Sequence, residues 1–367
     1  MRLSRKIPIQ FSTCLFVAML VSAAAVQAAP FAYIANEQGN SVSVIDTASN
    51  KVVTTIAGIS GALGVAANSS GTRVYVTGSG QLYVIDTSSN SVVATIPVGG
   101  PLADGVAVNP SGSRVYVANG GSAASVSVID TSSNSVVATV SVGLGAYGLA
   151  VSPDGTHVYV TTSFSRGGNE GSMVAVIDAA SNSVITTISV GPPLGNPFGV
   201  VVSPTGTRAY LANGAGHSIS VIDTSSNTVV ATVPSGNSPF GIAINPAGTR
   251  VYVTNQDSST VSVIDTSSNV VAAVISVGSN PIGVSVTPDG TRLYVANNVL
   301  NAVSVIDTSS NTVIGTINVG SGPYAFGQFI SPGPPPALMP APSSLLLAGT
   351  GMVLLGLYRM RFRRRAA

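Results

Sequence analysis

Cysteine, tryptophan, histidine and charged residues are scarce in this chain. Its 367 residues include one Cys, no Trp, two His, 15 Lys or Arg and 13 Asp or Glu. So few charges exclude a disordered polyelectrolyte and a coiled coil, both of which are rich in charged side chains. The one cysteine, Cys14, lies in an N-terminal segment that we expect to be removed. The mature chain would then have no disulfide, no cysteine-bound metal and no cysteine nucleophile.

Positive charge gathers at the two ends of the chain. Arg2, Arg5 and Lys6 lie near the start, and an arginine cluster over 359–365 lies near the end. Between these clusters there are 7 basic and 13 acidic residues, which gives this middle region a net charge of −6. Because phosphate binding needs a basic surface, nucleic acid is excluded as a partner of the middle region.

The N-terminus has the layout of a secretory signal peptide. Basic residues precede the apolar run 11–26, and small residues follow it at Val26-Gln27-Ala28. We predict a signal peptide over 1–28 that is cleaved after Ala28. The alternative is an uncleaved anchor, but the run is shorter than the ~20 residues that a membrane-spanning helix needs.

The C-terminus carries a second export feature. Residues 332–344 form a proline-rich spacer with the motif Pro340-Ala341-Pro342-Ser343, and 345–367 contain an apolar segment followed by the arginines. We predict a transmembrane helix with its end in the cytoplasm. The arrangement resembles the PEP-CTERM sorting signal of Gram-negative bacteria, although Ala341 stands where that signal usually has Glu. The resemblance implies processing at Pro340 and Pro342 by the membrane protease exosortase; the alternative is a plain anchor.

The middle of the chain is a repeated unit. The tripeptide Val-Ile-Asp recurs seven times at intervals of 40 to 48 residues. Each copy follows a strand such as Tyr252-Val253-Thr254-Asn255 and precedes a Ser/Asn turn. The recurring aspartates are Asp46, Asp86, Asp130, Asp178, Asp223, Asp265 and Asp307. The arginines found two residues before the tyrosine are Arg73, Arg114, Arg208, Arg250 and Arg292, and His157 takes this place in another copy.

One unit contains four short strands, which we call A to D. Strands A, B and C are 239–244, 250–254 and 260–264 in one copy, and strand D is 229–233 in the copy before it. β-branched residues that alternate with small polar ones, between turns rich in Pro, Gly, Asn and Ser, are typical of half-buried strands. Seven such units predict an all-β fold, a seven-bladed β-propeller of four-stranded antiparallel blades over 29–331.

The first and last copies predict how the ring closes. Residues 31–36 begin at strand B, whereas 324–330 form a strand A with no strand B after it, so the last strand would join the first blade. With Tyr-Val-Thr-Asn in strand B, Pro-Asp-Gly-Thr-Arg before it and Val-Ile-Asp after it, residues 31–331 resemble the YVTN family of β-propeller repeats. The resemblance implies an exported scaffold or binding protein and brings no catalytic residue with it.

Residues that recur in every copy are interpreted as structural. The repeated Asp can accept backbone N–H bonds in the turn that follows it, and we expect it to pair with the repeated Arg. His157 then replaces an arginine, and only His217 is left as an unexplained imidazole. The sequence shows no metal-ligand spacing and no nucleophile with a base, so we predict no metal, no cofactor and no enzyme. A lactonase-like periplasmic enzyme, or the propeller subunit of a redox complex, is the alternative.

Loop lengths indicate where a partner would bind. In an antiparallel blade the A–B and C–D turns lie at one end, and the B–C and D–A loops lie at the other. The B–C loop is lengthened slightly at 120–124 and strongly at 163–172, and the D–A loop is lengthened at 191–196. Glu37, Asp104 and Asp257 break the repeat on the same face. The predicted ligand-binding residues are Phe164, Arg166, Asn169, Glu170, Asn196 and His217; neutral drift of the loops is the alternative.

These predictions combine into one function. We expect a monomeric, exported propeller that acts as a non-enzymatic scaffold or binding module of the bacterial cell envelope or extracellular matrix. It would lie in the periplasm or on the outer surface, anchored transiently in the inner membrane by its C-terminal helix. The expected partners are the export machinery, exosortase and an envelope protein or polysaccharide.

Overall fold

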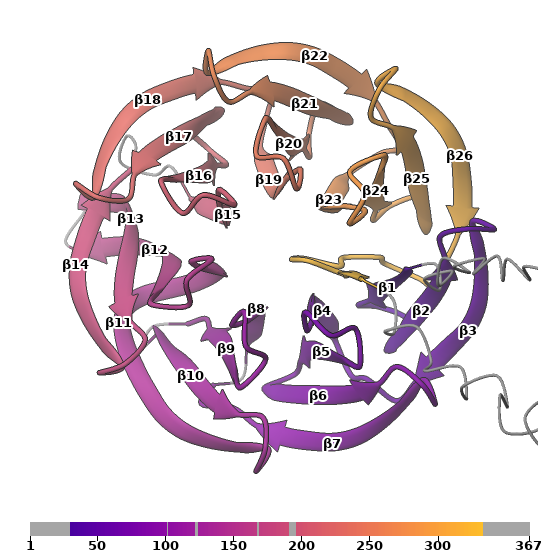
Figure 1. The fold of residues 1–367 in the computed structure, drawn as a ribbon, viewed down its shortest axis with the longest axis horizontal. Coiled ribbons are helices and arrows are strands. Elements are labelled where there is room, and N and C mark those ends of the chain that lie inside the picture. Colours follow the sequence, from indigo (N-terminus) through magenta and orange to yellow (C-terminus); the bar gives the residue numbers. More distant parts are fainter. Residues whose placement is uncertain (1–29, 101, 122–123, 167–168, 191–195, 333–367) are drawn as a thin grey trace, which may run out of the picture.

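The part of the chain that the structure describes is built of β-strands. The computed structural model describes residues 30–100, 102–121, 124–166, 169–190 and 196–332. Within these ranges the strands form antiparallel sheets arranged around a central axis, with no helix among them (Figure 1). The predicted all-β class and the four-stranded antiparallel repeat are confirmed. The predicted signal peptide, the spacer beyond Pro332 and the transmembrane helix lie outside the described residues, as do Ala28, Pro340 and Pro342.

Five sheets have four strands each, and hydrogen bonds join each strand to the next. In the first sheet the successive neighbours are β27 (Ile330–Ser331), β1 (Phe31–Asn36), β2 (Ser41–Asp46) and β3 (Lys51–Ala57). In the second they are β4 (Ala62–Ala67), β5 (Arg73–Gly78), β6 (Gln81–Asp86) and β7 (Ser91–Pro97). The others are β15 (Pro197–Val202), β16 (Arg208–Asn213), β17 (Ser218–Asp223) and β18 (Thr228–Pro234); β19 (Pro239–Ile244), β20 (Arg250–Asn255), β21 (Thr260–Asp265) and β22 (Val270–Ser276); and β23 (Pro281–Val286), β24 (Arg292–Asn297), β25 (Ala302–Asp307) and β26 (Thr312–Asn318).

The sixth sheet has seven strands. They are β8 (Ala103–Val108), β9 (Arg114–Asn119), β10 (Ala124–Asp130), β11 (Ser135–Val151), β12 (His157–Arg166), β13 (Asn169–Asp178) and β14 (Ser183–Ser189). Strand β11 is 17 residues long because its first part pairs with β10 up to Gly143, and its second part pairs with β12 from Leu144 onward. This sheet therefore contains two four-stranded repeats that share β11, where the other copies have a separate D–A loop.

Burial follows the order of the strands from the axis outward. The inner strands have side chains packed on both faces; β20, for example, is buried at every position after Arg250. The outermost strands leave many side chains in solvent, and Val270 and Val274 of β22 are 54% and 61% exposed. The hydrophobic core therefore lies between neighbouring sheets, because the two faces of each sheet's inner strands are covered by the sheets on either side.

Turn chemistry explains the repeated Asp and Asn of the C–D turns. The aspartate accepts backbone N–H bonds as predicted, and Asp223 Oδ1 lies 3.0 Å from the nitrogens of both Ser225 and Ser226. The turn ends on an asparagine in the left-handed region, which Asn tolerates better than most residues. Seven asparagines do so, with φ from 48° to 55°: Asn50, Asn90, Asn134, Asn182, Asn227, Asn269 and Asn311.

Glycine and threonine set the distance between sheets at the axis. The Gly241 N–H donates to Thr254 Oγ1 (2.8 Å), and this hydroxyl donates to the Ile282 carbonyl of the next sheet (2.8 Å). A Cβ added at Gly241 would lie 2.1 Å from that carbonyl oxygen. The inner strands thus approach too closely for a side chain here, and the Thr of the repeat motif links one sheet to the next. Thr77 and Thr161 make the equivalent bonds.

The last described segment lies between β1 and β4 and reaches the centre of the ring (Figure 1). The strand predicted over 324–330 differs from the observed structure, in which only Ile330–Ser331 forms a ladder with β1. The interruption has a conformational cause, because Ala325 and Gly327 have φ of 45° and 118°. The rest of the segment forms backbone hydrogen bonds with the strands on both sides of it. The Tyr324 N–H donates to Ala35 O of β1 (2.8 Å), and Phe326 O accepts from the Val65 N–H of β4 (2.9 Å).

Candidate functional site

The two ends of the central axis differ in their side chains. We call the end formed by the A–B and C–D turns the turn face, and the end formed by the B–C and D–A loops the loop face. Because every strand A runs from the loop face to the turn face, equivalent positions of the repeats form rings around the axis. The second residue of strand A lies near the loop face, and the last residue lies near the turn face.

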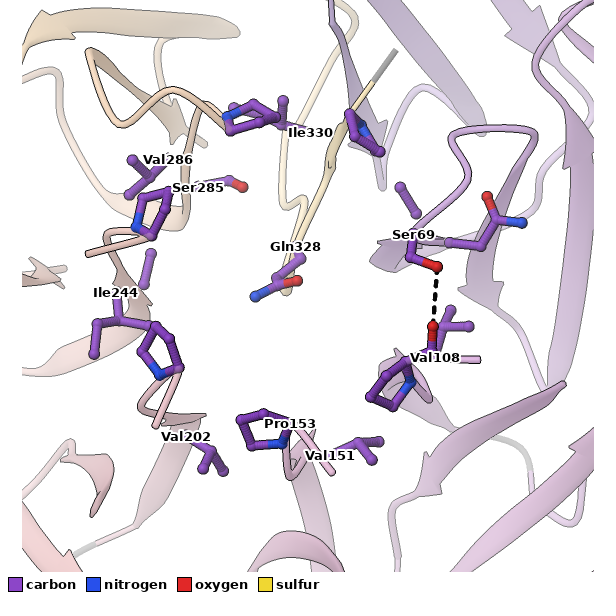
Figure 2. A pocket seen from close by; sticks show the side chains of 18 of the residues that line it. Ser69, Val108, Val151, Pro153, Val202, Ile244, Ser285, Val286, Gln328 and Ile330 are labelled. Carbon is purple, nitrogen blue, oxygen red and sulfur yellow. Dashed lines mark hydrogen bonds between the residues drawn. The ribbon is translucent and has the colours of Figure 1, made fainter. Parts of the chain in front are cut away.

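The turn face is hollowed into a cavity of about 440 Å³ around the axis (Figure 2). Apolar ends of strand A form its wall, and prolines of the A–B turns form its rim. These rim residues are Pro110, Pro153, Pro204, Pro246 and Pro288. Two polar residues break the pattern. Ser69 replaces a proline and donates to Pro110 O (3.0 Å), and Gln328, two residues before the wall residue Ile330, points toward the centre (Figure 2).

Aromatic rings cluster around the axis at the loop face. Phe198 and Phe240 are stacked with ring centroids 4.2 Å apart. Tyr147, Tyr324 and Phe326 each form a T-shaped contact with one ring of this pair, with centroid distances of 5.4 to 5.7 Å. Phe240, Ile282 and Phe326 are buried together, with Phe198 and Tyr324 packed against them. The second residues of the strand A copies are Leu63, Asp104, Tyr147, Phe198, Phe240, Ile282 and Tyr324.

Asp104 is the charged member of this ring. Burial raises the pKa of its carboxyl to about 6. The carboxylate occupies space left by Gly120, just after the neighbouring strand β9, where an added Cβ would lie 2.6 Å from Asp104 Oδ2. Asp104 also acts on Tyr324, whose pKa is raised by its own burial first and then by the charges of Asp104 and Glu37. The loop-face end of the axis is therefore an electronegative site lined by aromatic rings.

The predicted insert at 163–172 is not an irregular loop. Strands β12 and β13 continue into it as a hairpin, with Phe164 opposite Gly171, Ser165 opposite Glu170 and Arg166 opposite Asn169. The side chains of Phe164, Arg166, Asn169 and Glu170 lie outside the described side chains. Asn196 is exposed and has φ of 38°, and its carbonyl accepts the Gly214 N–H (3.0 Å). Binding at these residues stays a prediction.

His217 has a structural partner. It occupies a B–C turn position with φ of 47°, and Asn40 and Asn301 occupy the same position in other copies with φ of 46° and 51°. In each case the side chain accepts a backbone N–H from the D–A loop. Gly61 donates to Asn40 and Gly322 to Asn301, both at 2.8 Å, and Ser238 donates to His217 Nδ1 at 3.1 Å. Alignment of the turns would have revealed this equivalence in the sequence.

Ser238, His217 and Asp257 lie together but do not form a catalytic triad. The hydroxyl of Ser238 donates to Asp257 Oδ2, whereas His217 contacts the backbone nitrogen of Ser238. A nucleophilic serine needs an imidazole that accepts the proton of its hydroxyl, and here the imidazole nitrogen accepts a backbone proton instead. Among the described residues there is also no group of three or more His, Cys, Asp or Glu that could hold a metal ion.

The repeated arginines and aspartates act within the fold. Four ion pairs form as expected, between Arg73 and Asp86, Arg114 and Asp130, Arg208 and Asp223, and Arg250 and Asp265. Arg292 departs from the pattern and donates to the backbone carbonyl of Thr47 in the first sheet (2.8 Å). Hydrogen bonds within the turn, led by the one from the Ser88 side chain, lower the pKa of Asp86 to about 2.

Two groups of residues near the axis were missed in the sequence. They are the aromatic side chains Tyr147, Phe198, Phe240 and Tyr324 at the loop face, and the cavity residues around Gln328 at the turn face. The signal that could have found them was the second or last position of each strand A, compared across the copies. Asp104 stands among apolar residues at the second position, whereas Gln328 lies two residues before the last position, which Ile330 occupies.

Two solved structures resemble the described fold. A chain of the hydrazine synthase of Kuenenia stuttgartiensis is 22% identical with a TM-score of 0.68, and the match covers 80% of this chain and 99% of that one. A functionally unknown protein from Desulfotomaculum acetoxidans is 21% identical with a TM-score of 0.68, covering 82% and 98%. These likenesses support a β-propeller fold and carry no function. No family model and no curated protein matches the chain.

A membrane-spanning segment is not found in the described ranges. None of their elements is a helix long and apolar enough to cross a bilayer.

Proposed function

We propose that this protein is an exported, seven-bladed propeller that acts as a non-enzymatic binding or scaffold module of the bacterial cell envelope or extracellular matrix. The YVTN-like repeats and the PEP-CTERM-like end support the export part of the proposal. The binding part rests on one observation above all: side chains that break the repeat gather at the two ends of the axis, where a ligand can reach them.

Most of the aspartates and arginines that recur along the chain have structural contacts, which supports a structural role for them. Turn aspartates bind backbone N–H groups, and four of them pair with arginines. The Ser238 cluster lacks the contact that a nucleophile needs. This arrangement favours recognition over chemistry.

The count of seven blades and the closure of the ring belong to the same proposal. The two repeats that share β11 and the five four-stranded sheets together make seven units. The pairing of β27 with β1 would complete the first unit. The last and first units also contact each other through side chains, since the Tyr294 hydroxyl donates to Asn50 Oδ1 at 2.6 Å.

The binding role is tested by shortening the β12–β13 hairpin. Residues 163–172 are replaced by a loop of the length common to the other copies, and the variant is used in a pull-down from the native envelope fraction beside the unchanged protein. We expect the same melting temperature, because the length of a surface loop costs little free energy, and weaker capture of the envelope partner. Equal capture, with 120–124 trimmed as well, would place the site elsewhere or deny it.

The export role is tested by mass spectrometry of the surface-exposed protein. We expect a chain that begins at Ala29 and lacks the C-terminal arginines. Recovery of a peptide that contains Arg363, Arg364 and Arg365 from the surface-exposed protein would replace the sorting signal with a simple anchor.

A further inference from the structure

The second residues of the strand A copies form a ring at the loop face, and one of them breaks its symmetry. The second position of strand A occurs seven times around the axis, and six of these positions carry Leu, Ile, Phe or Tyr. Asp104 occupies the seventh, next to Tyr147 of the following repeat, whose carbonyl would lie 2.4 Å from a Cβ added at Gly105. An aliphatic residue at this position would match its neighbours, so the carboxylate is a local departure from what packing favours.

Within the part of the chain that the structure describes, the Asp104 carboxylate has no counter-charge, and no group there forms a hydrogen bond or an ion pair with it. Asp104 is half-buried, and removing part of a carboxylate from water without a pairing or hydrogen-bonding group costs free energy. Such an uncompensated group is expected where a ligand supplies the missing partner.

The surroundings of Asp104 fit a cation. Tyr147 and Tyr324 are half-buried, so part of each ring is open to solvent. Phe198 and Phe240 extend the aromatic surface. Glu37, on the first B–C turn, adds a second negative charge that acts on Tyr324. Aromatic faces attract cations through their quadrupole, and an ammonium group is the ligand that combines this attraction with a carboxylate.

We propose that Asp104, Tyr147 and Tyr324 form a binding site for an ammonium group at the loop-face end of the axis. The ammonium belongs either to a free amine or to a lysine side chain of a partner, and in both cases it meets the Asp104 carboxylate. The site deepens the proposed binding role and rests on it. It also gives the loop face a specific point of contact on the axis.

The site is tested by calorimetric titration of the full chain with tetramethylammonium chloride, with tert-butanol as a neutral probe of similar shape. We expect saturable binding of the cation alone, and at least about tenfold weaker binding by Asp104→Asn, which keeps the shape of the side chain and removes its charge. Asp257→Asn is the matched control, because Asp257 is an exposed carboxylate of the same face, and it should bind as the unchanged protein does. Equal affinity of the Asp104→Asn variant and the unchanged protein, or equal affinity for both probes, overturns the proposal.

A second variant separates a ligand site from a structural carboxylate. Asp104→Leu restores the apolar ring, so we expect it to melt at a higher temperature at pH 7 and to lose binding of the cation. A lower melting temperature would show that Asp104 stabilises the fold, and would overturn the proposal.

The source of the ammonium is read from the envelope pull-down with Asp104→Asn. Loss of a partner that the unchanged protein retains assigns the ammonium to a protein lysine, and an unchanged partner assigns it to a free amine. This result is independent of the hairpin variant. The binding role can therefore fail while the ammonium site stands, and the reverse also holds.

Discussion

The turn face and the loop face are built by the same repeats and yet carry different side chains. At the turn face the A–B turns keep their prolines in five copies, and the strand ends form an aliphatic wall around one glutamine. At the loop face, aromatic rings and a carboxylate meet on the axis, and one B–C connection grows into a hairpin. The turn face is constrained because its residues make the turns themselves. The loop face varies more because the lengths of its connections can change without disturbing the strands that they join.

Deletion of residues 324–331 should have the largest effect, because it removes residues from both ends of the axis. It takes away the buried Phe326 and Phe329 and the backbone bonds to β1 and β4. We expect a loss of more than about 3 kcal/mol in the free energy of unfolding, measured in urea. Gln328→Ala is the control, since this exposed side chain lies on the same segment. If the deletion melted like the intact protein, this segment would not hold the ring together.

Gly241→Ala should be the next most damaging change, because Gly241 lies between the two faces, where the inner strands of neighbouring sheets approach each other closely. The new Cβ would meet the Ile282 carbonyl at 2.1 Å, and backbone must move to admit it. We expect a cost of about 2 to 3 kcal/mol in chemical denaturation. Gly315→Ala on the outer strand β26 has no atom within 4 Å of the new Cβ and should be neutral or slightly stabilising. Similar costs for the two variants would refute close packing at the axis.

The pH dependence of stability should separate Asp104 from the turn aspartates. Burial raises the pKa of Asp104 to about 6 in the folded state, above the ~3.9 expected when unfolded. The folded protein then binds more protons between pH 4 and 6, so the free energy of unfolding falls as pH rises through this window.

Asp104→Leu removes this fall. We therefore expect the variant to gain stability over the unchanged protein from pH 4 to pH 7, by on the order of 1 to 3 kcal/mol. The turn aspartates have lowered pKa values, as Asp86 does, so their stabilisation is lost as pH falls below ~4. Because both proteins retain them, that loss cancels in the difference. Parallel pH profiles of the two proteins would mean that Asp104 titrates normally.

Substitution of His217 should give the smallest effect. Asn places an acceptor where Asn40 and Asn301 have theirs, so His217→Asn should stay within about 0.5 kcal/mol of the unchanged protein, whereas His217→Ala should cost about 1 kcal/mol through the lost bond to the Ser238 N–H. Thermal melting of the two variants measures the difference. Equal melting temperatures would show that the imidazole nitrogen does not matter for the turn.

Particular residues show how far sequence reasoning reached. The strand positions and the Asp and Asn of the C–D turns were predictable because they depend on neighbours along the chain. The expected pairing of Arg with Asp held in four copies and failed at Arg292, where the first sheet offers the Thr47 carbonyl instead. The strand expected over 324–330 was too long, because positive φ at Ala325 and Gly327 interrupts it.

The sequence by itself determined the repeated unit, its four strands and its turns, since period-two patterning and turn residues act within a few residues of each other. Tertiary structure alone decided which side chains meet on the axis. Asp104 and Tyr324 are 220 positions apart in the chain, and only the packing of sheets around a common axis brings their charges into range of each other. The same packing places Gln328 at the centre of the turn-face cavity (Figure 2), because that cavity exists only once the sheets have packed around the axis.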